Sequence, residues 1–371
     1  MQLSRTRSLI HQAVRSASNN GIIIESFGNK KVITLDRPKS LNALDLGMVR
    51  EMYPKLKEWN EDGKTKMVII KGSGEKAFCA GGDVLAVTKS YTAGGSTMYK
   101  DFFREEYILN NLIATYKIPY IALIDGITMG GGCGLSINGK YRIATEKTLL
   151  AMPETALGLF PDVGGSYFLP RLPGKLGLFL ALTGYRLKGL DVYFSQMATH
   201  FVNSSDLAGL EKALLALNEF GESDVNGALS KFLPEAGTQP TNFSLTEVIE
   251  KINKCFTSQT YEGILKNLEE DGSEWALKQL SILNKMSPTS LKVTFQQLEY
   301  GSKMTHSEVF PMEYRLTQRF VADHDFHEGC RAILVDKDRN PKWKPSKLED
   351  VSEKTVANYF KRLPESEELT L

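Results

Sequence analysis

The chain contains little cysteine and little histidine, and neither sign of charge is in excess. Among its 371 residues are four cysteines that lie far apart and form no C-x-x-C pair: Cys79, Cys133, Cys255 and Cys330. This spacing argues against a zinc site or a disulfide framework and favours a reducing compartment. The 45 basic and 44 acidic residues leave a net charge of +1, so the chain as a whole has no electrostatic attraction for nucleic acid or an anionic membrane.

Long apolar runs and the usual hydrolase motifs are also missing. No run approaches the length of a bilayer-spanning helix, so we expect a soluble mature protein with no membrane partner. There is no G-x-S-x-G motif, and no histidine stands beside a glycine-framed serine or cysteine, which disfavours Ser-His and Cys-His catalysis. His324 and His327 have a spacing more typical of surface or packing positions than of a metal pair, and we expect no metal.

The first twenty residues differ from the rest of the chain. Arg5, Arg7 and Arg15 occur among serines, and no acid precedes Glu25. A basic amphipathic helix is what mitochondrial import recognises, so residues 1–20 predict a cleavable targeting segment and a location in the mitochondrial matrix. The alternative is a frayed basic N-terminus.

The elements that follow predict an α/β core. Two β-branched runs separated by Gly-Asn indicate a hairpin at 21–36, and a helix is expected after an N-cap at Asp45, with a bend at Pro54. Apolar runs at 67–71 and 119–125 are typical of buried strands, and helical patterns separate them.

A Gly-, Pro- and polar-rich stretch at 221–242 is the best candidate for a domain boundary. We therefore expect a core over residues 21–225 and a mostly helical region over 226–371. Ser287 and Pro288 mark a plausible helix start in that second region.

Two glycine turns could hold an anion or a developing oxyanion. "GGGCG" (130–134) enters a predicted helix, whose first N–H groups are free, and Gly81 and Gly82 follow an apolar piece in "KAFCAGGDV". One amide from each turn would make a two-sided cradle for a carbonyl oxygen that becomes negative. Close strand-helix packing at the first turn, or two unrelated turns, would explain the same pattern.

Two acids lie in the apolar stretch "MPETALGLFPDVGG" (152–165). Glu154 could simply lie near a helix start and Asp162 could cap a loop, but acids in apolar surroundings usually have a shifted pKa or a specific partner. Glu106, beside Glu105 in "FFREEY", reads by itself as part of a solvated helix face.

Four motifs, in this order and spacing, resemble the crotonase (enoyl-CoA hydratase/isomerase) superfamily: "LDRPKSLNAL", "AFCAGGDV", "GITMGGGCGLS" and "MPETALGLFPDVGG". The C-terminal "DFHEGCRAILVDKDRNPKWKP" narrows the resemblance to an acyl-CoA hydrolase subgroup, and the similarity spans about residues 21 to 362. The resemblance implies a crotonase-like spiral of ββα units, followed by a helical region that helps to close the acyl site.

The resemblance also assigns roles to residues. It implies that an acyl-CoA thioester binds with its carbonyl oxygen between the N–H groups of Gly82 and Gly131. Gly134 stands where hydratases carry their first glutamate, Glu154 matches their second, and Asp162 replaces a usual glycine. One acid of the hydratase pair is therefore lost and another is gained.

These departures match the hydrolase subgroup, and the resemblance to that subgroup implies hydrolysis of 3-hydroxyisobutyryl-CoA, and of 3-hydroxypropionyl-CoA, in valine breakdown. Glu154 would attack the carbonyl or deprotonate a water; the sequence does not separate these roles. Asp162 would hold the 3-hydroxyl or orient the water, and Glu106 would support that network. The alternatives are an enoyl-CoA hydratase or isomerase and a non-catalytic acyl-CoA-binding protein of the same fold.

Coenzyme A is part of the substrate, and no separate cofactor is implied. Lys39, Lys76 and Gly81 flank the motifs and are candidates for contacts with the CoA moiety, although solvated surface charge would explain the two lysines equally well. Relatives form trimers and hexamers, so a homo-oligomer is possible.

Overall fold

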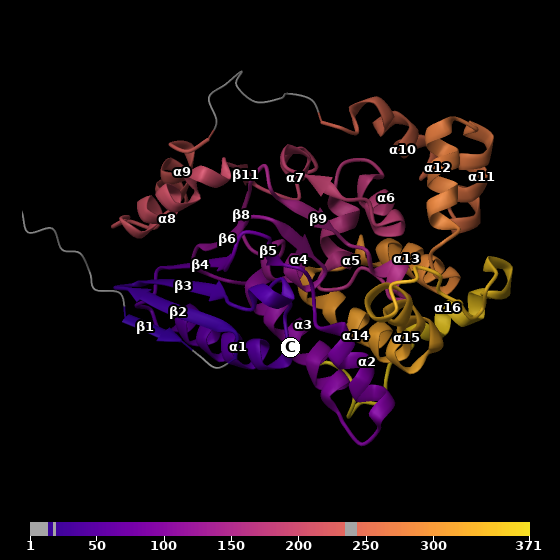
Figure 1. The fold of residues 1–371 in the computed structure, drawn as a ribbon, viewed down its shortest axis with the longest axis horizontal. Helices are drawn as coiled ribbons and strands as arrows, with labels where there is room; N and C mark the ends of the chain where they lie inside the picture. Colours follow the sequence, from indigo (N-terminus) through magenta and orange to yellow (C-terminus); the bar gives the residue numbers. More distant parts are fainter. Residues whose placement is uncertain (1–13, 18–19, 234–242) are drawn as a thin grey trace, which may run out of the picture.

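Two β-sheets lie at the centre of the computed structural model, which describes residues 14–17, 20–233 and 243–371 (Figure 1). The larger sheet has the order β1-β2-β3-β4-β6-β8-β11 and the smaller one β10-β9-β7-β5. The strands are β1 (Val14–Ala17), β2 (Ile22–Phe27), β3 (Lys30–Leu35), β4 (Met67–Gly72), β5 (Ala77–Cys79), β6 (Tyr120–Ile124), β7 (Ile127–Met129), β8 (Tyr141–Ala144), β9 (Leu149–Ala151), β10 (Leu187–Lys188) and β11 (His200–Phe201).

From β4 to β9, consecutive strands alternate between the two sheets. Strands β4, β6 and β8 join the larger sheet in parallel, while β5, β7 and β9, which follow them directly in sequence, build the smaller one in parallel. A helical segment follows each pair: α2 (Val84–Ala93) and α3 (Met98–Ala114), then α4 (Gly131–Ser136), then the 3-10 helix η2 (Glu154–Leu157). The expected spiral of ββα units is confirmed.

Burial explains the unbroken apolar run of β4. Val68 and Ile70 belong to one hydrophobic cluster, and Met67 and Ile69 belong to another on the opposite face of the sheet. A strand covered on both faces has no solvent side, so its sequence does not alternate between apolar and polar residues. The predicted hairpin at 21–36 is also confirmed, with β2 and β3 paired antiparallel.

The predicted first helix is α1 (Leu46–Glu61). Its N-cap is Asp45, whose carboxylate accepts a hydrogen bond from the Met48 N–H over 2.9 Å. Met52, Leu56 and Trp59 are buried at helical spacing, and the helix continues through Pro54. Asp45 also forms an ion pair of 3.0 Å with Arg37, which ties the helix start to the segment after β3.

The remaining helices cover the spiral and form the C-terminal region. Figure 1 shows α10 to α16 (orange to yellow) on the other side of the molecule from the strands β1 to β3 (indigo). The α-helices after η2 are α5 (Gly165–Phe168), α6 (Leu176–Thr183), α7 (Leu190–Phe194), α8 (Leu207–Leu215), α9 (Glu222–Ser230), α10 (Ile249–Cys255), α11 (Tyr261–Asp271), α12 (Glu274–Leu283), α13 (Pro288–Gly301), α14 (His306–Ala322), α15 (His324–Cys330) and α16 (Glu353–Phe360). The expected helical region is confirmed, and α13 begins after an N-cap at Ser287, whose hydroxyl accepts from the Ser290 N–H.

The domain boundary expected at residue 225/226 lies inside helix α9. Val225 and Leu229 are buried in the cluster on the outer face of the larger sheet, so the polar composition of 221–242 does not mark a linker there. The sequence prediction missed this helix because polar and small residues separate its few buried apolar residues from one another. A boundary after Ser230 fits the structure better, and residues 234–242 lie outside the described residues.

The predicted targeting segment, residues 1–20, also lies largely outside the described residues. Residues 14–17 form β1, which pairs antiparallel with β2 at the edge of the larger sheet. Within the described ranges, no helix has both the length and the apolar character that crossing a bilayer requires.

Two glycines allow η2 to lie directly against α15. A Cβ on Gly158, which has φ +70°, would lie 2.2 Å from the carbonyl oxygen of Asp325, and one on Gly329 would lie 2.2 Å from that of Leu157. Each glycine therefore faces backbone that cannot move aside. The segment that carries Glu154 is fixed to the C-terminal region by main-chain contact.

We expect Gly158→Ala to lower the free energy of unfolding by roughly 2–5 kcal/mol, because it adds both a left-handed alanine and a backbone clash. Gly63→Ala is the matched control: Gly63 has φ +64°, but an added Cβ would meet nothing within 4 Å. It should cost only about 1–2 kcal/mol. If urea unfolding shows the same loss of free energy of unfolding for both variants, the contact of Gly158 with α15 does not contribute to stability as we expect.

Candidate active site

A cavity of about 560 Å³ opens between the spiral and the C-terminal region. Its lining includes six of the eight residues proposed from the sequence, brought from four separate segments of the chain: Gly81, Gly82, Glu106, Gly131, Glu154 and Asp162. Because the six come together around one space, the two glycine turns and the three acids have to be considered as one site.

The two glycine turns lie side by side. Gly82 follows β5 and pairs with Leu44 in an isolated bridge, and Gly131 is the first residue of α4. A Cβ on Gly131 would lie 3.1 Å from the Gly82 nitrogen. Neither Gly82 N–H nor Gly131 N–H donates a hydrogen bond within the described part of the chain. Two free amides on adjacent turns suit an oxyanion.

Three carboxyl groups face the same cavity and are almost completely buried. The exposed fractions are 2% for Glu106, 5% for Glu154 and 5% for Asp162. Glu106 Oε1 and Glu154 Oε2 have no hydrogen-bond partner among the described residues, whereas Asp162 accepts a hydrogen bond of 2.7 Å from the Tyr107 hydroxyl. Two of the three acids therefore have a buried oxygen free for a substrate or water.

Burial raises the pKa of all three groups. For Glu106 the pKa is well above its ordinary value because of desolvation and then repulsion from Asp162 and Glu154, and for Glu154 because of desolvation and then repulsion from Asp162. Desolvation raises the pKa of Asp162 to about 6, although the Tyr107 hydrogen bond opposes it. Arg186 also lines the cavity, but its side chain is exposed and does not offset the buried charge.

The sequence prediction missed a fourth buried acid, Glu313 on α14. It is fully buried, and its carboxylate accepts hydrogen bonds from the N–H groups of Gly164 (2.8 Å) and Ser166 (2.9 Å). Desolvation raises its pKa to about 8. A signal was present, since Glu313 lies four residues after Val309 and three before Leu316, on the apolar face of the helix.

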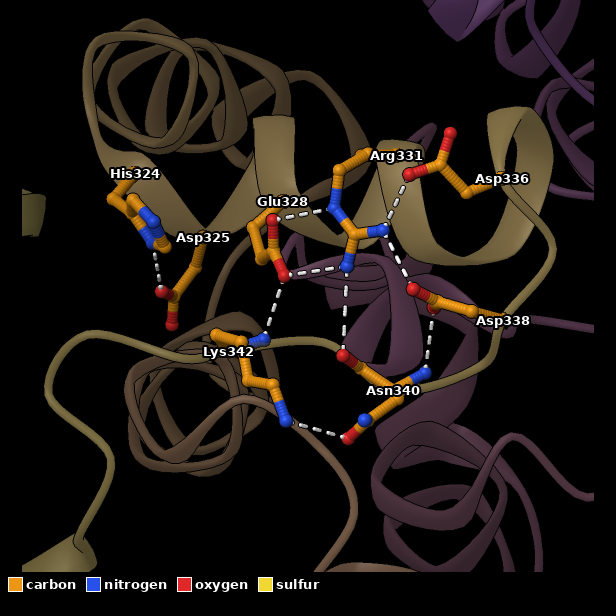
Figure 2. A network of polar contacts seen from close by, with 8 residues as sticks. All are labelled: His324, Asp325, Glu328, Arg331, Asp336, Asp338, Asn340 and Lys342. Carbon is orange, nitrogen blue, oxygen red and sulfur yellow. Dashed lines mark hydrogen bonds and ion pairs between the residues drawn. The ribbon is translucent and has the colours of Figure 1, made fainter.

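The C-terminal region supplies an apolar wall. Ile333 and Leu334 line the cavity from the π-helix η6 (Arg331–Val335), which follows α15. Figure 2 shows the Arg331 guanidinium between the carboxylates of Glu328 (2.8 Å), Asp336 (2.6 Å) and Asp338 (2.7 Å). These ion pairs hold both ends of η6, which fixes the turn that carries the two apolar side chains.

Position 134 has no room for a side chain. A Cβ on Gly134 would lie 2.8 Å from Val163 Cβ and 2.9 Å from Asn110 Nδ2. This is the position that the resemblance matches to the first glutamate of hydratases, and here Val163 and Asn110 fill the space around it. The packing around Gly134 therefore leaves no space for an acidic side chain at this position.

Two proposed residues lie apart from the cavity. Lys39 and Lys76 are exposed, and neither lines it, although Ser40, next to Lys39, does. The structure thus places both lysines on the surface, and only Gly81 of the three residues proposed for CoA contacts lines the cavity.

Comparison with known proteins identifies the family. Residues 30–360 match the family model described as "Enoyl-CoA hydratase/isomerase". The chain belongs to this family. Proteins named "3-hydroxyisobutyryl-CoA hydrolase, mitochondrial" are similar over nearly the whole chain: the rat protein is 54% identical, with 97% of this chain and 94% of that protein covered, and the zebrafish protein is 56% identical, with 94% and 92% covered.

Solved structures of the family have the same fold. A carnitinyl-CoA dehydratase from Mycobacterium thermoresistibile superposes with a TM-score of 0.87 at 35% identity, covering 95% of this chain and 99% of that one. An enoyl-CoA hydratase from Rhodobacter sphaeroides gives 0.85 at 36%, covering 95% and 100%. Both similarities include the C-terminal region as well as the spiral.

Asp162 should make stability depend on pH. Its folded pKa of about 6 exceeds its ordinary value of 3.8, so the native state holds a proton that the unfolded chain releases as pH rises between these values. Wild type should therefore lose stability relative to Asp162→Asn from about pH 4 to pH 6. The difference should reach roughly 3 kcal/mol. Urea unfolding across pH 4 to 7.5 measures it, and a pH-independent difference would contradict the burial of this charge.

Proposed function

We propose that the chain hydrolyses the thioester of 3-hydroxyisobutyryl-CoA, and also of 3-hydroxypropionyl-CoA, to the free hydroxy acid and coenzyme A. One observation carries the proposal: three buried carboxyl groups face the same cavity as two free backbone amides, and the hydratase glutamate position is closed at Gly134. The names of the rat and zebrafish relatives support the same substrate.

The amides of Gly82 and Gly131 would bind the thioester oxygen. As oxygen adds to the carbonyl carbon, negative charge develops on that oxygen, and preorganised N–H donors stabilise it without reorganisation. Losing one such donor typically costs about 10²–10³ in rate. A side chain would crowd both positions: a Cβ on Gly131 would lie 2.7 Å from Glu106 Oε1, and one on Gly82 would lie 3.0 Å from the Phe102 ring.

Glu154 would deliver the oxygen. It either attacks the carbonyl carbon to give a mixed anhydride, which water then cleaves, or removes a proton from water as that water attacks. In both routes the carbon–sulfur bond breaks, the sulfur leaves as coenzyme A thiol, and one water is consumed. The carboxylate stands next to the amide cradle, since a Cβ on Gly130 would lie 2.9 Å from Glu154 Oε1.

Asp162 and Glu106 would select and orient the substrate. Asp162, held by Tyr107, would accept a hydrogen bond from the 3-hydroxyl or position the water, and Glu106 would complete this network. An acyl group without the hydroxyl would leave a buried acid unpaired, which penalises it.

The CoA moiety would extend past Gly81 towards Lys39 and Lys76 at the surface. CoA is part of the substrate, and the reaction needs no other cofactor. The basic N-terminal segment and the names of the mitochondrial relatives support a mitochondrial location. The matrix and valine breakdown belong to the proposal itself. A homo-oligomer is compatible with this assignment.

Purified protein should release thiol from 3-hydroxyisobutyryl-CoA. Glu154→Gln and Asp162→Asn should each lower kcat by roughly 10²–10⁴-fold, because each removes a carboxylate that acts on the reacting groups. Glu105→Gln is the control: Glu105 is next to Glu106 in sequence but forms a 2.6 Å ion pair with Arg50 away from the cavity. It should keep wild-type activity.

Crotonyl-CoA separates the alternatives. Water addition to it, without thiol release from the hydroxyacyl ester, would show a hydratase instead. Tight binding of both esters with no turnover would show a non-catalytic binding protein. Near wild-type hydrolysis by folded Glu154→Gln and Asp162→Asn would contradict the assigned residues.

A further inference from the structure

Asp162 begins a segment with an unusual backbone. Val163 has φ +51° and Gly164 has φ +93°. A left-handed conformation is rare for a β-branched residue and persists only where the surroundings impose it. The direction of the Asp162 side chain therefore depends on the contacts that fix the backbone of residues 161–166.

Two helices of the C-terminal region hold that segment from one side. Glu313 on α14 accepts the N–H groups of Gly164 and Ser166. Gln297 on α13 donates through Nε2 to the Pro161 carbonyl oxygen over 2.6 Å and to the Ser166 hydroxyl oxygen over 2.8 Å. Both side chains are completely buried, so water cannot replace these bonds.

Two further hydrogen bonds to this segment come from the spiral. Asn138 donates to the Val163 carbonyl oxygen over 3.0 Å, and Tyr107 binds the Asp162 carboxylate itself. The carboxylate and its backbone are thus fixed from different elements. Glu313 and Gln297 bind the backbone of this segment and the Ser166 hydroxyl but not the Asp162 carboxylate, and they do not line the cavity.

We propose that Glu313 and Gln297 are positioning residues that hold the backbone of residues 161–166 so that Asp162 points into the cavity. The proposal deepens the proposed function and rests on it, because it makes the C-terminal helices part of the recognition of the hydroxyacyl group. It also explains why the acid Glu313 is buried here although it takes part in no step of the proposed hydrolysis.

The hydrogen-bond chemistry dictates the substitution to make. A carboxylate accepts at both oxygens, so Glu313 serves two N–H groups at once, whereas an amide presents its NH2 group to one of them. Glu313→Gln therefore breaks one bond at nearly constant volume. The matched control is Glu368→Gln, since Glu368 also accepts a backbone N–H, from Leu363, and pairs with Arg315 on the same helix, away from the cavity.

The experiment is a double-mutant cycle on 3-hydroxyisobutyryl-CoA hydrolysis. Glu313→Gln should lower kcat by roughly 10–100-fold with a small change in KM, because a displacement of about 1 Å costs that much. In an Asp162→Asn background the same change should cost less than about 3-fold, since Glu313 acts through Asp162. Glu368→Gln should leave kcat unchanged.

If Glu313→Gln lowers kcat by the same factor in the wild-type and Asp162→Asn backgrounds, the proposal is overturned. A general structural effect of Glu313 would not depend on Asp162. If Glu313→Gln does not fold, Gln297→Leu takes its place in the cycle with the same expectations. Should wild type release no thiol, the proposed function fails by itself. A crystal structure of Glu313→Gln then decides: a displaced Val163 backbone and a lost Tyr107–Asp162 hydrogen bond support positioning, and an unchanged segment overturns it.

Discussion

Four carboxyl groups are buried together in this molecule, and no buried cation lies beside them among the described residues. Desolvation and mutual repulsion raise the pKa of Glu106, Glu154, Asp162 and Glu313, and this costs folding free energy. The fold offsets that cost with main-chain donors, a tyrosine hydroxyl and close apolar packing. An acid that is poorly solvated, yet has one oxygen unpartnered, is in turn a stronger base towards a substrate proton.

The C-terminal region supports both acid-bearing segments through their backbones. Helix η2, which carries Glu154, meets α15 through Gly158 and Gly329, and the Ser287 N–H donates to the Thr155 carbonyl oxygen over 3.3 Å. The segment after Asp162 is held by α13 and α14. Apart from the Gln297–Ser166 hydroxyl bond, these contacts are made to main-chain atoms, so they support the cavity without occupying the acidic side chains that face it.

Much of the fold could be predicted from the sequence, since apolar periodicity, the Asp45 cap and the hairpin turn are local signals. The pairing of the two glycine turns and the role of the acids came from a resemblance, because contacts between distant segments have no local signal. Glu106 illustrates the limit: beside Glu105 it reads as surface, and only the packing of α3 shows that it is buried. The boundary near residue 225 failed because buried residues in α9 are diluted by polar neighbours.

The contact between η2 and α15 has a consequence for how the molecule is made. Glycine-to-carbonyl contacts join stretches that are far apart along the chain, and such long-range contacts form late and slowly. The ββα spiral leaves the ribosome first, before the helices that support the candidate site. A chain that ends before α15 would lack the backbone against which Gly158 packs, so the segment that carries Glu154 would be without this support even where the sheets have formed.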